Sequence, residues 1–252
     1  MGVALKAISF DLWDTLIHDD SDEPKRRARG LPSKRDERRR LVHVALDRIQ
    51  PIPPATVNLA YDVADAAFNK VWKDHAITWR IEERLAVVLK GLGRELPTRA
   101  FDAVVRAHQE MELTISPDVV DGAAAALAAL HGRYRMVVVS DAIVSPGWAL
   151  RKLLDNHGIA RYFDAFAFSD EIGHAKPHPD MFHHVSRAVG VPLDQFVHIG
   201  DREHNDIEGP RALGMKAVLF VATRATDRAG TTADAVCERY ADLPAIIDRL
   251  AG

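Results

Sequence analysis

Five polar residues lie just after short apolar runs and are of types that could carry out hydrolytic chemistry. They are Asp11, Ser140, Lys176, Asp201 and Asp206. Several carboxylates in one place repel one another unless a cation joins them, and Mg²⁺ with oxygen ligands suits that role. One carboxylate could then attack phosphorus as a nucleophile, while the lysine and the metal hold the negative oxygens of the transferred group.

These residues can meet only if the fold brings the ends of the apolar runs together. The runs are mostly apolar without alternation, which is typical of strands covered by helices on both faces; they cover Val3 to Phe10, Tyr134 to Ser140, Ala165 to Phe168, Phe196 to Ile199 and Ala217 to Val221. Segments of helical length lie between them: Val119 to His131, Ala149 to Asn156, Pro179 to Val189 and Ile207 to Leu213. This alternation predicts an α/β fold with a doubly wound, Rossmann-like parallel sheet, whose ligands gather at the carboxyl ends of the strands.

The stretch from 17 to 114 interrupts the alternation, because it has helical patterning and no convincing strand. Its expected helices run from Lys34 to Arg48, Ala55 to Lys73, Ile81 to Leu92 and Thr98 to Leu113, with prolines and glycines between them. We therefore expect two units: a core of residues 1–16 and 115–252, and an inserted all-helical domain of residues 17–114.

Composition excludes several classes of protein. With 33 basic and 36 acidic residues the net charge is −3, so general attraction to nucleic acid or to anionic lipid is not expected. No apolar stretch reaches the ~20 residues that a membrane span needs, and the first apolar run is too brief for a signal peptide. Cys237 is the only cysteine, which excludes an intrachain disulfide and favours a buried structural thiol in a short edge strand. We expect a cytoplasmic protein.

A charged segment precedes the first expected helix of the insert. Acidic residues from Asp19 to Glu23 are followed by basic residues from Lys25 to Arg40. A phosphate or nucleic-acid contact is one interpretation of this segment. A solvated loop with partly neutralising halves is the favoured one, because no aromatic residue is interleaved for base stacking.

Four segments in order give the chain a resemblance to the haloacid dehalogenase-like hydrolase superfamily. They are Phe10-Asp11-Leu12-Trp13-Asp14-Thr15-Leu16, then Val137 to Asp141, then Ser169 to Pro179 with Lys176, and finally His198-Ile199-Gly200-Asp201 through Asp206. Each segment is weak evidence alone, but their order and their places at strand ends make the set specific. The insert between the first and second segments resembles the family's helical cap of the C1 type.

The resemblance implies a role for each matching residue. Asp11 would be the nucleophile and a metal ligand, and Lys176 would bridge the nucleophile and the phosphoryl oxygens. Ser140, Asp141 and Thr15 would belong to the phosphate-binding part of the site, with Thr15 closing the turn behind the nucleophile. Mg²⁺ would be held by Asp11, by the backbone carbonyl of Trp13 and by Asp201, with Asp206 holding metal-bound water or Lys176. The expected activity is hydrolysis of small phosphorylated metabolites by a monomer or homodimer.

Trp13 departs from the family pattern. Phosphatases of the family usually have a second Asp at this position as general acid and base, a role worth typically 10²- to 10⁴-fold in rate. Haloacid dehalogenases lack that Asp and often have an aromatic residue there, so a 2-haloacid dehalogenase is one alternative. Asp201 opposes it, since dehalogenases carry uncharged residues in the fourth segment. A protein that binds a phosphorylated ligand or a partner with little turnover is the other alternative.

The histidines add little to this assignment. His174, His178, His183, His184, His198 and His204 show no convincing zinc spacing. We expect only His204, which lies within the fourth segment, to approach the site.

Overall fold

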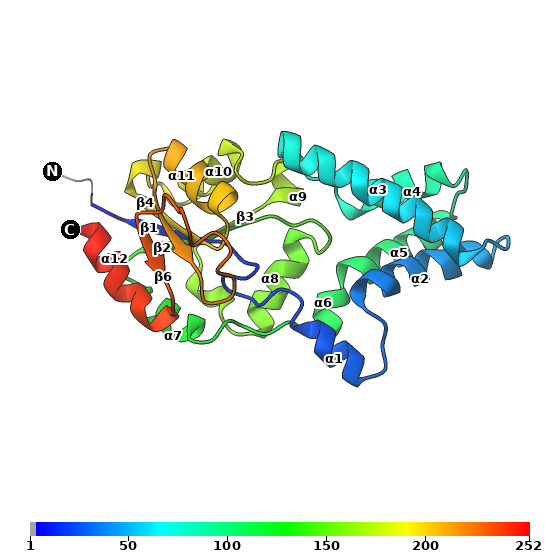
Figure 1. Ribbon diagram of the computed structural model, residues 1–252, viewed down its shortest axis with the longest axis horizontal. Coiled ribbons are helices and arrows are strands. Elements are labelled where there is room, and N and C mark those ends of the chain that lie inside the picture. Colours follow the sequence, from blue (N-terminus) through cyan, green and yellow to red (C-terminus); the bar gives the residue numbers. More distant parts are fainter. Residues whose placement is uncertain (1–3) are drawn as a thin grey trace.

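A six-stranded parallel sheet organises the chain. The computed structural model describes residues 4–252. The strands are β1 (Ala7–Phe10), β2 (Arg135–Ser140), β3 (Ala165–Phe168), β4 (Phe196–Gly200), β5 (Lys216–Phe220) and β6 (Ala235–Cys237), and they lie in the order β3-β2-β1-β4-β5-β6. Every neighbouring pair is parallel, and helices cover the sheet (Figure 1). The predicted doubly wound α/β fold is confirmed.

Alternate residues of each strand pack against opposite helical layers, as the pleat of a strand requires. Ile8 and Phe10 belong to a cluster with α7 (Ala123–Leu130), α8 (Gly147–Asn156) and α12 (Leu243–Ala251). Ala7 belongs to a second cluster, with α10 (Pro179–Val189). Because both faces are buried, the strands need continuous apolar sequence rather than alternation. That requirement made them recognisable in the sequence.

The first strand lies at the switch point of the sheet. After β1 the chain proceeds to β2 and β3 on one side, and then crosses to β4, β5 and β6 on the other side. The backbone N–H of Asp11 continues the pairing of β1 with β4, donating to the carbonyl of Ile199 at 2.8 Å. The carboxyl ends of β1 and β4 therefore open side by side where ligands bind in such sheets.

Residues 17–114 are mainly helical and have their own apolar cluster. Their helices are α1 (Asp22–Ala28), α2 (Lys34–Asp47), α3 (Pro54–His75), α4 (Ile81–Gly91), α5 (Thr98–Gln109) and α6 (Met111–Thr114). Val42, Val57 and Leu85 contribute to a buried cluster that contains no strand residue. In Figure 1, α2 to α5 lie to one side of the sheet. Backbone hydrogen bonds join the two parts, from Thr78 to Gly173 at 3.3 Å and from Ala175 to Ala76 at 2.7 Å.

Several element boundaries differ from those expected. The first strand begins at Ala7, while Val3 lies outside the described residues. The helix expected over Thr98 to Leu113 is divided into α5 and α6 at Glu110, whose φ of −95° and ψ of 4° depart from helical values. The helix expected over 207–213 is a π-helical turn, Glu203–Glu208, followed by α11 (Gly209–Ala212). The short helix α9 (Ser169–Ile172) follows β3. Cys237 is buried at the end of the edge strand β6.

The charged segment from Asp19 to Arg40 is ordered, so its prediction as a solvated loop was wrong. Asp22 begins α1 and Lys34 begins α2, and both side chains are buried. The Lys34 ammonium lies 2.9 Å from Asp22, 3.0 Å from Asp20 and 3.5 Å from Glu112 of α6. Burial alone lowers the pKa of Lys34, but these carboxylates outweigh it and raise the pKa above its usual value. The segment folds through ion pairs with a distant helix, which its own composition does not reveal.

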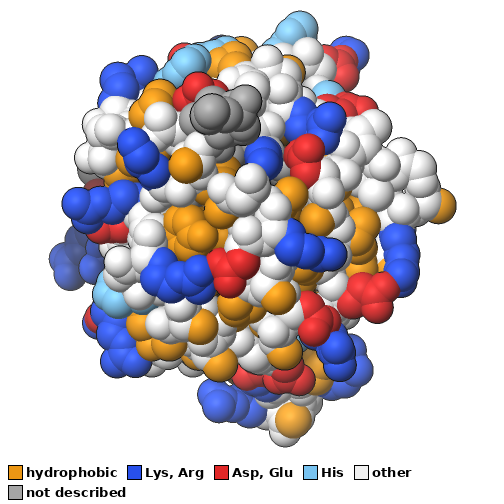
Figure 2. All heavy atoms as spheres, turned by 90° about the vertical axis from the view of Figure 1, so that its left-hand side faces the viewer, with side chains coloured by type: hydrophobic (Ala, Val, Ile, Leu, Met, Phe, Trp, Pro, Cys, Tyr) orange, Lys and Arg blue, Asp and Glu red, His pale blue; other side chains and the backbone are white. Residues whose placement is uncertain are grey.

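The surface gives no sign of a membrane span. Among residues 4–252, no helix combines the length and the apolar character needed to cross a bilayer. Figure 2 shows the face that carries the chain termini, where basic and acidic side chains alternate around small apolar areas. This face presents no block of a single charge.

Removing the ammonium of Lys34 should destabilise the helical segment strongly. Lys34→Met leaves Asp22 and Glu112 buried without their cation, and loss of one partner from a buried pair costs about 3–5 kcal/mol. Lys70→Met is the matched control, because its pair with Asp74 is largely exposed and such pairs contribute about 1 kcal/mol or less. Urea denaturation of both variants measures the two losses. Equal losses would contradict a stabilising role for the buried network.

Candidate active site

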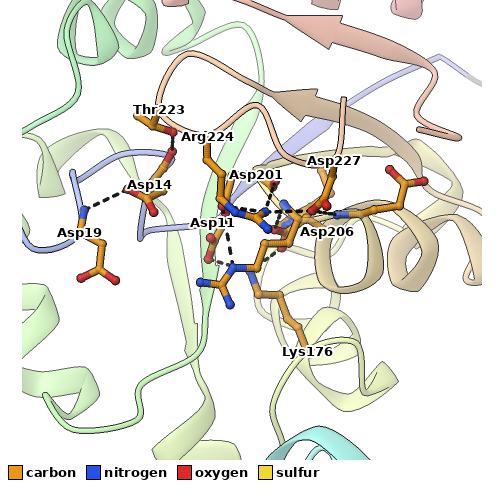
Figure 3. Close-up of polar contacts among 12 residues, drawn as sticks. Asp11, Asp14, Asp19, Lys176, Asp201, Asp206, Thr223, Arg224 and Asp227 are labelled. Atoms are coloured by element: carbon orange, nitrogen blue, oxygen red, sulfur yellow. Dashed lines mark hydrogen bonds and ion pairs between the residues drawn. The ribbon is translucent and has the colours of Figure 1, made fainter. Parts of the chain in front are cut away.

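A buried lysine joins two carboxylates at the carboxyl edge of the sheet. Lys176 Nζ lies 2.6 Å from Asp11 Oδ1 and 2.6 Å from Asp206 Oδ1. Asp11 follows β1, and Asp206 lies in the π-helical turn after β4. All three side chains are at least nine-tenths buried. Figure 3 shows Lys176 extending to this pair, so the structure brings together residues that are up to 195 positions apart in the sequence.

Asp206 is held in place by neighbours that the sequence did not single out. His198 Nε2 lies 3.2 Å from Asp206 Oδ1, and His198 Nδ1 lies 2.8 Å from Ser9 Oγ. Burial lowers the pKa of His198, although Asp206 opposes the shift; a neutral ring then donates to Asp206 from Nε2 and accepts from Ser9 at Nδ1. A Cβ at Gly200 would overlap the Asp206 carboxyl. Glycine at position 200 therefore makes room for this carboxylate.

Asp201 is buried beside this pair and lacks hydrogen-bond partners. Both of its carboxylate oxygens are inaccessible and accept no hydrogen bond from a described residue. Its nearest cations are Arg224 Nη1 at 3.6 Å and Arg202 Nε at 3.8 Å. Oxygens of Asp11, Asp201 and Asp206 lie within 4.8 Å of one another. Burial, and then the charges of Asp11 and Asp206, raise the pKa of Asp201 to about 8.

The pKa values of the other two carboxylates, Asp11 and Asp206, are shifted in opposite directions. Burial raises the pKa of Asp11 to about 6, even though Lys176 opposes the shift. The charge of Lys176 and the hydrogen bond from His198 outweigh the effect of burial on Asp206 and hold its pKa below the usual range. Asp206 thus anchors Lys176 through their hydrogen bond. Lys176 contacts one oxygen of Asp11, Oδ1.

The donor set of this cluster fits a hard divalent cation such as Mg²⁺. Mg²⁺ prefers carboxylate and carbonyl oxygens and keeps several of its waters. The oxygens of Asp201, which accept no hydrogen bond from a described residue, are donors of this kind. Asp11 and Asp201 could hold the ion together with a backbone carbonyl of the turn after β1.

Of the three remaining residues predicted to bind phosphate, one lines the cavity and two do not. Asp141 lines the cavity in front of Asp11, and its Oδ1 accepts a hydrogen bond from the backbone N–H of Lys176 at 2.8 Å. Ser140 is buried and its hydroxyl donates to the Asp141 carbonyl at 3.3 Å. Thr15 is buried behind the turn, and its carbonyl accepts from Tyr240 Oη at 2.8 Å. Neither Ser140 nor Thr15 is among the residues that line the cavity.

Trp13 lines the cavity, whereas Asp14 beside it and His204 of the fourth segment are not among the residues that line it. Asp14 has a φ of 53°, its Oδ1 accepts from the N–H of Asp19 at 3.1 Å, and its carbonyl accepts from Thr223 Oγ1. Figure 3 shows this group to one side of Asp11. His204 is exposed and pairs with Glu208 at 3.0 Å. The expectation that His204 approaches the site was therefore wrong, because its side chain lies on the outer face of the turn.

A cavity of about 210 Å³ lies over the carboxylates and has walls from both parts of the chain. The sheet side contributes Asp11, Trp13, Asp141, Lys176 and Arg202, among others. The helical segment contributes Asp19, Asp20, Lys34, Arg38, Trp72 and Glu112. Sequence analysis named the segment from Asp19 to Arg40 only as a disfavoured candidate for a phosphate contact, although four of these residues belong to it. It did not find Trp72 or Glu112, because no motif marks them and only tertiary packing brings them here.

Comparisons with known proteins agree with this geometry. The family model for haloacid dehalogenase-like hydrolases matches residues 5–214. A glyceraldehyde 3-phosphate phosphatase of Methanocaldococcus jannaschii is 24% identical over 226 residues, which cover 88% of each protein. The same-named protein of Methanothermobacter thermautotrophicus is 35% identical over 86 residues, which cover 34% of this chain and only 37% of that relative.

Solved structures share the fold. A 2-haloacid dehalogenase from Pseudomonas syringae pv. tomato aligns with a TM-score of 0.68 at 20% identity and covers 98% of this chain and 99% of that one. Identity at this level shows the fold alone. The family match, however, extends over most of the chain and includes all four strand-end segments around Asp11, Ser140, Lys176 and Asp201. The chain belongs to the haloacid dehalogenase-like hydrolase family.

Proposed function

We propose that the protein is a Mg²⁺-dependent phosphatase of small phosphorylated metabolites that works through an aspartyl-phosphate at Asp11. The observation that carries the proposal is the pair of contacts from Lys176 to Asp11 and Asp206, next to the unpartnered carboxylate of Asp201. The phosphatase names of the two relatives support the same reaction class.

In the first step an oxygen of Asp11 attacks the phosphorus and the bond from phosphorus to the ester oxygen breaks. Lys176 stays hydrogen-bonded to Asp11 and neutralises charge on the transferred phosphoryl group. Water then attacks the acyl phosphate, which releases inorganic phosphate and restores the Asp11 carboxylate. Asp11, the Trp13 carbonyl and Asp201 would hold Mg²⁺, with Asp206 nearby. When bound, the ion supplies positive charge beside the phosphoryl oxygens.

The volume of the cavity favours a small substrate. Its volume of about 210 Å³ lies below the roughly 300–1,000 Å³ of common ligand pockets. We propose that residues 17–114 act as a cap, because their side chains form the wall opposite Asp11. Lys34 and Arg38 of that wall are accompanied by Asp19, Asp20 and Glu112. The leaving group would therefore meet a wall of mixed charge.

Trp13 favours one alternative, a 2-haloacid dehalogenase, in which an aromatic residue often follows the nucleophile by two positions. The charge of the site opposes this alternative. Dehalogenation needs no metal, whereas Asp201 and Asp206 add two buried carboxylates to Asp11. Release of chloride from 2-chloropropionate without added metal, together with no phosphatase activity, would overturn the proposal in favour of the dehalogenase. Absence of both activities would favour a binding protein with little turnover.

Mg²⁺ should stabilise the folded protein through Asp201. A ligand at 100 times its dissociation constant adds about 2.7 kcal/mol to the free energy of unfolding, so Tm measured by calorimetry should rise with added Mg²⁺. Asp201→Asn should remove most of this rise, because it deletes a charged ligand. Asp155→Asn is the control, since Asp155 is exposed and pairs with Lys152. Equal Mg²⁺ effects on the two variants would place the metal elsewhere.

Asp11→Asn should abolish turnover of a phosphate ester, to below about 10⁻³ of the original kcat, because an amide does not attack phosphorus. Asp14→Asn is the matched control: Asn also tolerates the left-handed conformation, and the Asp14 carboxylate points away from the cavity. The control should keep its activity. Mass spectrometry must show that the introduced amide has not deamidated, and persistent turnover by an intact amide would exclude the aspartyl-phosphate.

Trp13→Asp should improve hydrolysis of alkyl phosphates more than hydrolysis of aryl phosphates. Aryl and acyl phosphates leave as stable anions, but an alkoxide needs the proton that Trp13 does not supply. The ratio of kcat/KM for glycerol phosphate to that for p-nitrophenyl phosphate measures the effect, and circular dichroism checks the fold. Trp13→Asn is the control, because it removes the same bulk without adding an acid.

An unchanged ratio in folded Trp13→Asp would mean that another residue is the acid. Asp19 would then be the first residue to test. It lines the same cavity, and desolvation together with the charge of Asp20 raises its pKa to about 6.

A further inference from the structure

Two histidines and an aspartate meet outside the catalytic cluster, where the segment after α9 enters α10. His174 lies in that segment and forms an antiparallel bridge with Ile77, just after α3. His178 is the N-cap of α10, and Asp180 lies in its first turn. The position is where α9, α10 and the end of α3 come together (Figure 1). None of the three residues lines the catalytic cavity.

Their polar atoms face one another without bonding directly. Asp180 Oδ2 lies 3.8 Å from His174 Nε2 and 3.7 Å from His178 Nδ1. Both distances exceed the 2.7–3.2 Å of an N–H···O hydrogen bond. In a tetrahedral zinc site with bonds of about 2.0–2.1 Å, neighbouring ligand atoms lie about 3.4 Å apart. The two distances to Asp180 are close to the edge of such a tetrahedron, and ligand atoms of all three residues lie within 4.8 Å of one another.

The two rings lie face to face, with centroids 3.7 Å apart and planes 4° apart. His174 Nδ1 is buried and has no hydrogen-bond partner among the described residues. Imidazole ligates a metal ion through a ring nitrogen that carries no proton.

Two existing contacts must be exchanged. The parallel rings direct their in-plane lone pairs side by side, so one ring must turn out of the stack before both can bind one ion. His178 Nδ1 accepts a long hydrogen bond of 3.3 Å from the N–H of Asp180. A metal ion at Nδ1 would replace this cap bond. The side chains of His174, His178 and Asp180 are 35%, 32% and 55% exposed, so an ion can reach them from solvent.

We propose that His174, His178 and Asp180 form a binding site for a transition-metal ion of the zinc type, with water completing the coordination. Imidazole nitrogens favour Zn²⁺, Co²⁺, Ni²⁺ or Cu²⁺ over Mg²⁺, whereas the oxygens of the catalytic carboxylates favour Mg²⁺. The site would tie the segment that carries Lys176, two residues after His174, to the first turn of α10. It is separate from the catalytic site and does not depend on the proposed phosphatase activity.

Cobalt is the probe, because its visible spectrum reports its ligands. The full-length protein is first saturated with Mg²⁺ to fill the carboxylate cluster, and then titrated with Co²⁺. A four-coordinate site with nitrogen ligands gives an intense visible band, and six oxygen ligands give a weak one. We expect one intense-band Co²⁺ per chain, displaced by Zn²⁺. Asp201→Asn should leave this band unchanged even if it abolishes the effects of Mg²⁺.

Three variants locate the ligands. His174→Ala and His178→Asn should each weaken Co²⁺ binding at least about tenfold, and Asn at position 178 keeps a side chain that can cap α10. His183→Ala is the matched control, because His183 is exposed on the same helix and should bind Co²⁺ unchanged. Circular dichroism confirms the fold of each variant. A weak band only, or an intense band that survives both His174→Ala and His178→Asn, would overturn the proposal.

Discussion

Three carboxylates and one ammonium group are buried together where β1 and β4 end, and the rest of the site follows from their charge. Lys176 bonds Asp11 and Asp206 at 2.6 Å each, but Asp201 receives no hydrogen bond from a described residue. Its charge faces Arg224 Nη1 at 3.6 Å and Arg202 Nε at 3.8 Å, and burial without a hydrogen bond disfavours the ionised form of a carboxylate. A bound cation would favour that form. Gly200 and His198 serve the cluster by making room for Asp206 and by orienting its carboxylate.

The sequence predicted the sheet and the meeting of these four charged residues because both depend on local features. A strand buried on two faces needs a continuous apolar run, and the polar residue after each run must lie at the carboxyl edge. Asp11, Lys176, Asp201 and Asp206 were found in this way. The buried network of Lys34 was not, because its partner Glu112 is 78 residues away. His198 was also missed, because its role depends on β1 pairing with β4 in the register that sets it opposite Ser9.

The conformation of the turn after β1 explains why Asp14 does not supply the acid that is missing at Trp13. Asp14 has a positive φ, and its carboxylate accepts a hydrogen bond from the backbone N–H of Asp19. Its backbone carbonyl accepts a hydrogen bond from Thr223, in the loop after β5. Turning the side chain toward Asp11 would break the contact with Asp19. An acid at position 14 therefore does not substitute for one at position 13, although the two positions are adjacent in the sequence.

The helical segment and the catalytic lysine are connected mainly through backbone atoms. Ala175 donates to the carbonyl of Ala76 at 2.7 Å, and Thr78 donates to the carbonyl of Gly173 at 3.3 Å. Both contacts lie within three residues of Lys176. The segment that positions the lysine is therefore also the one against which the helical segment rests, and a displacement of α3 would act on the chain next to Lys176. Because backbone groups make these contacts, the side chains in the sequence do not indicate where the contacts lie. A sequence motif can therefore locate the lysine without revealing what supports it.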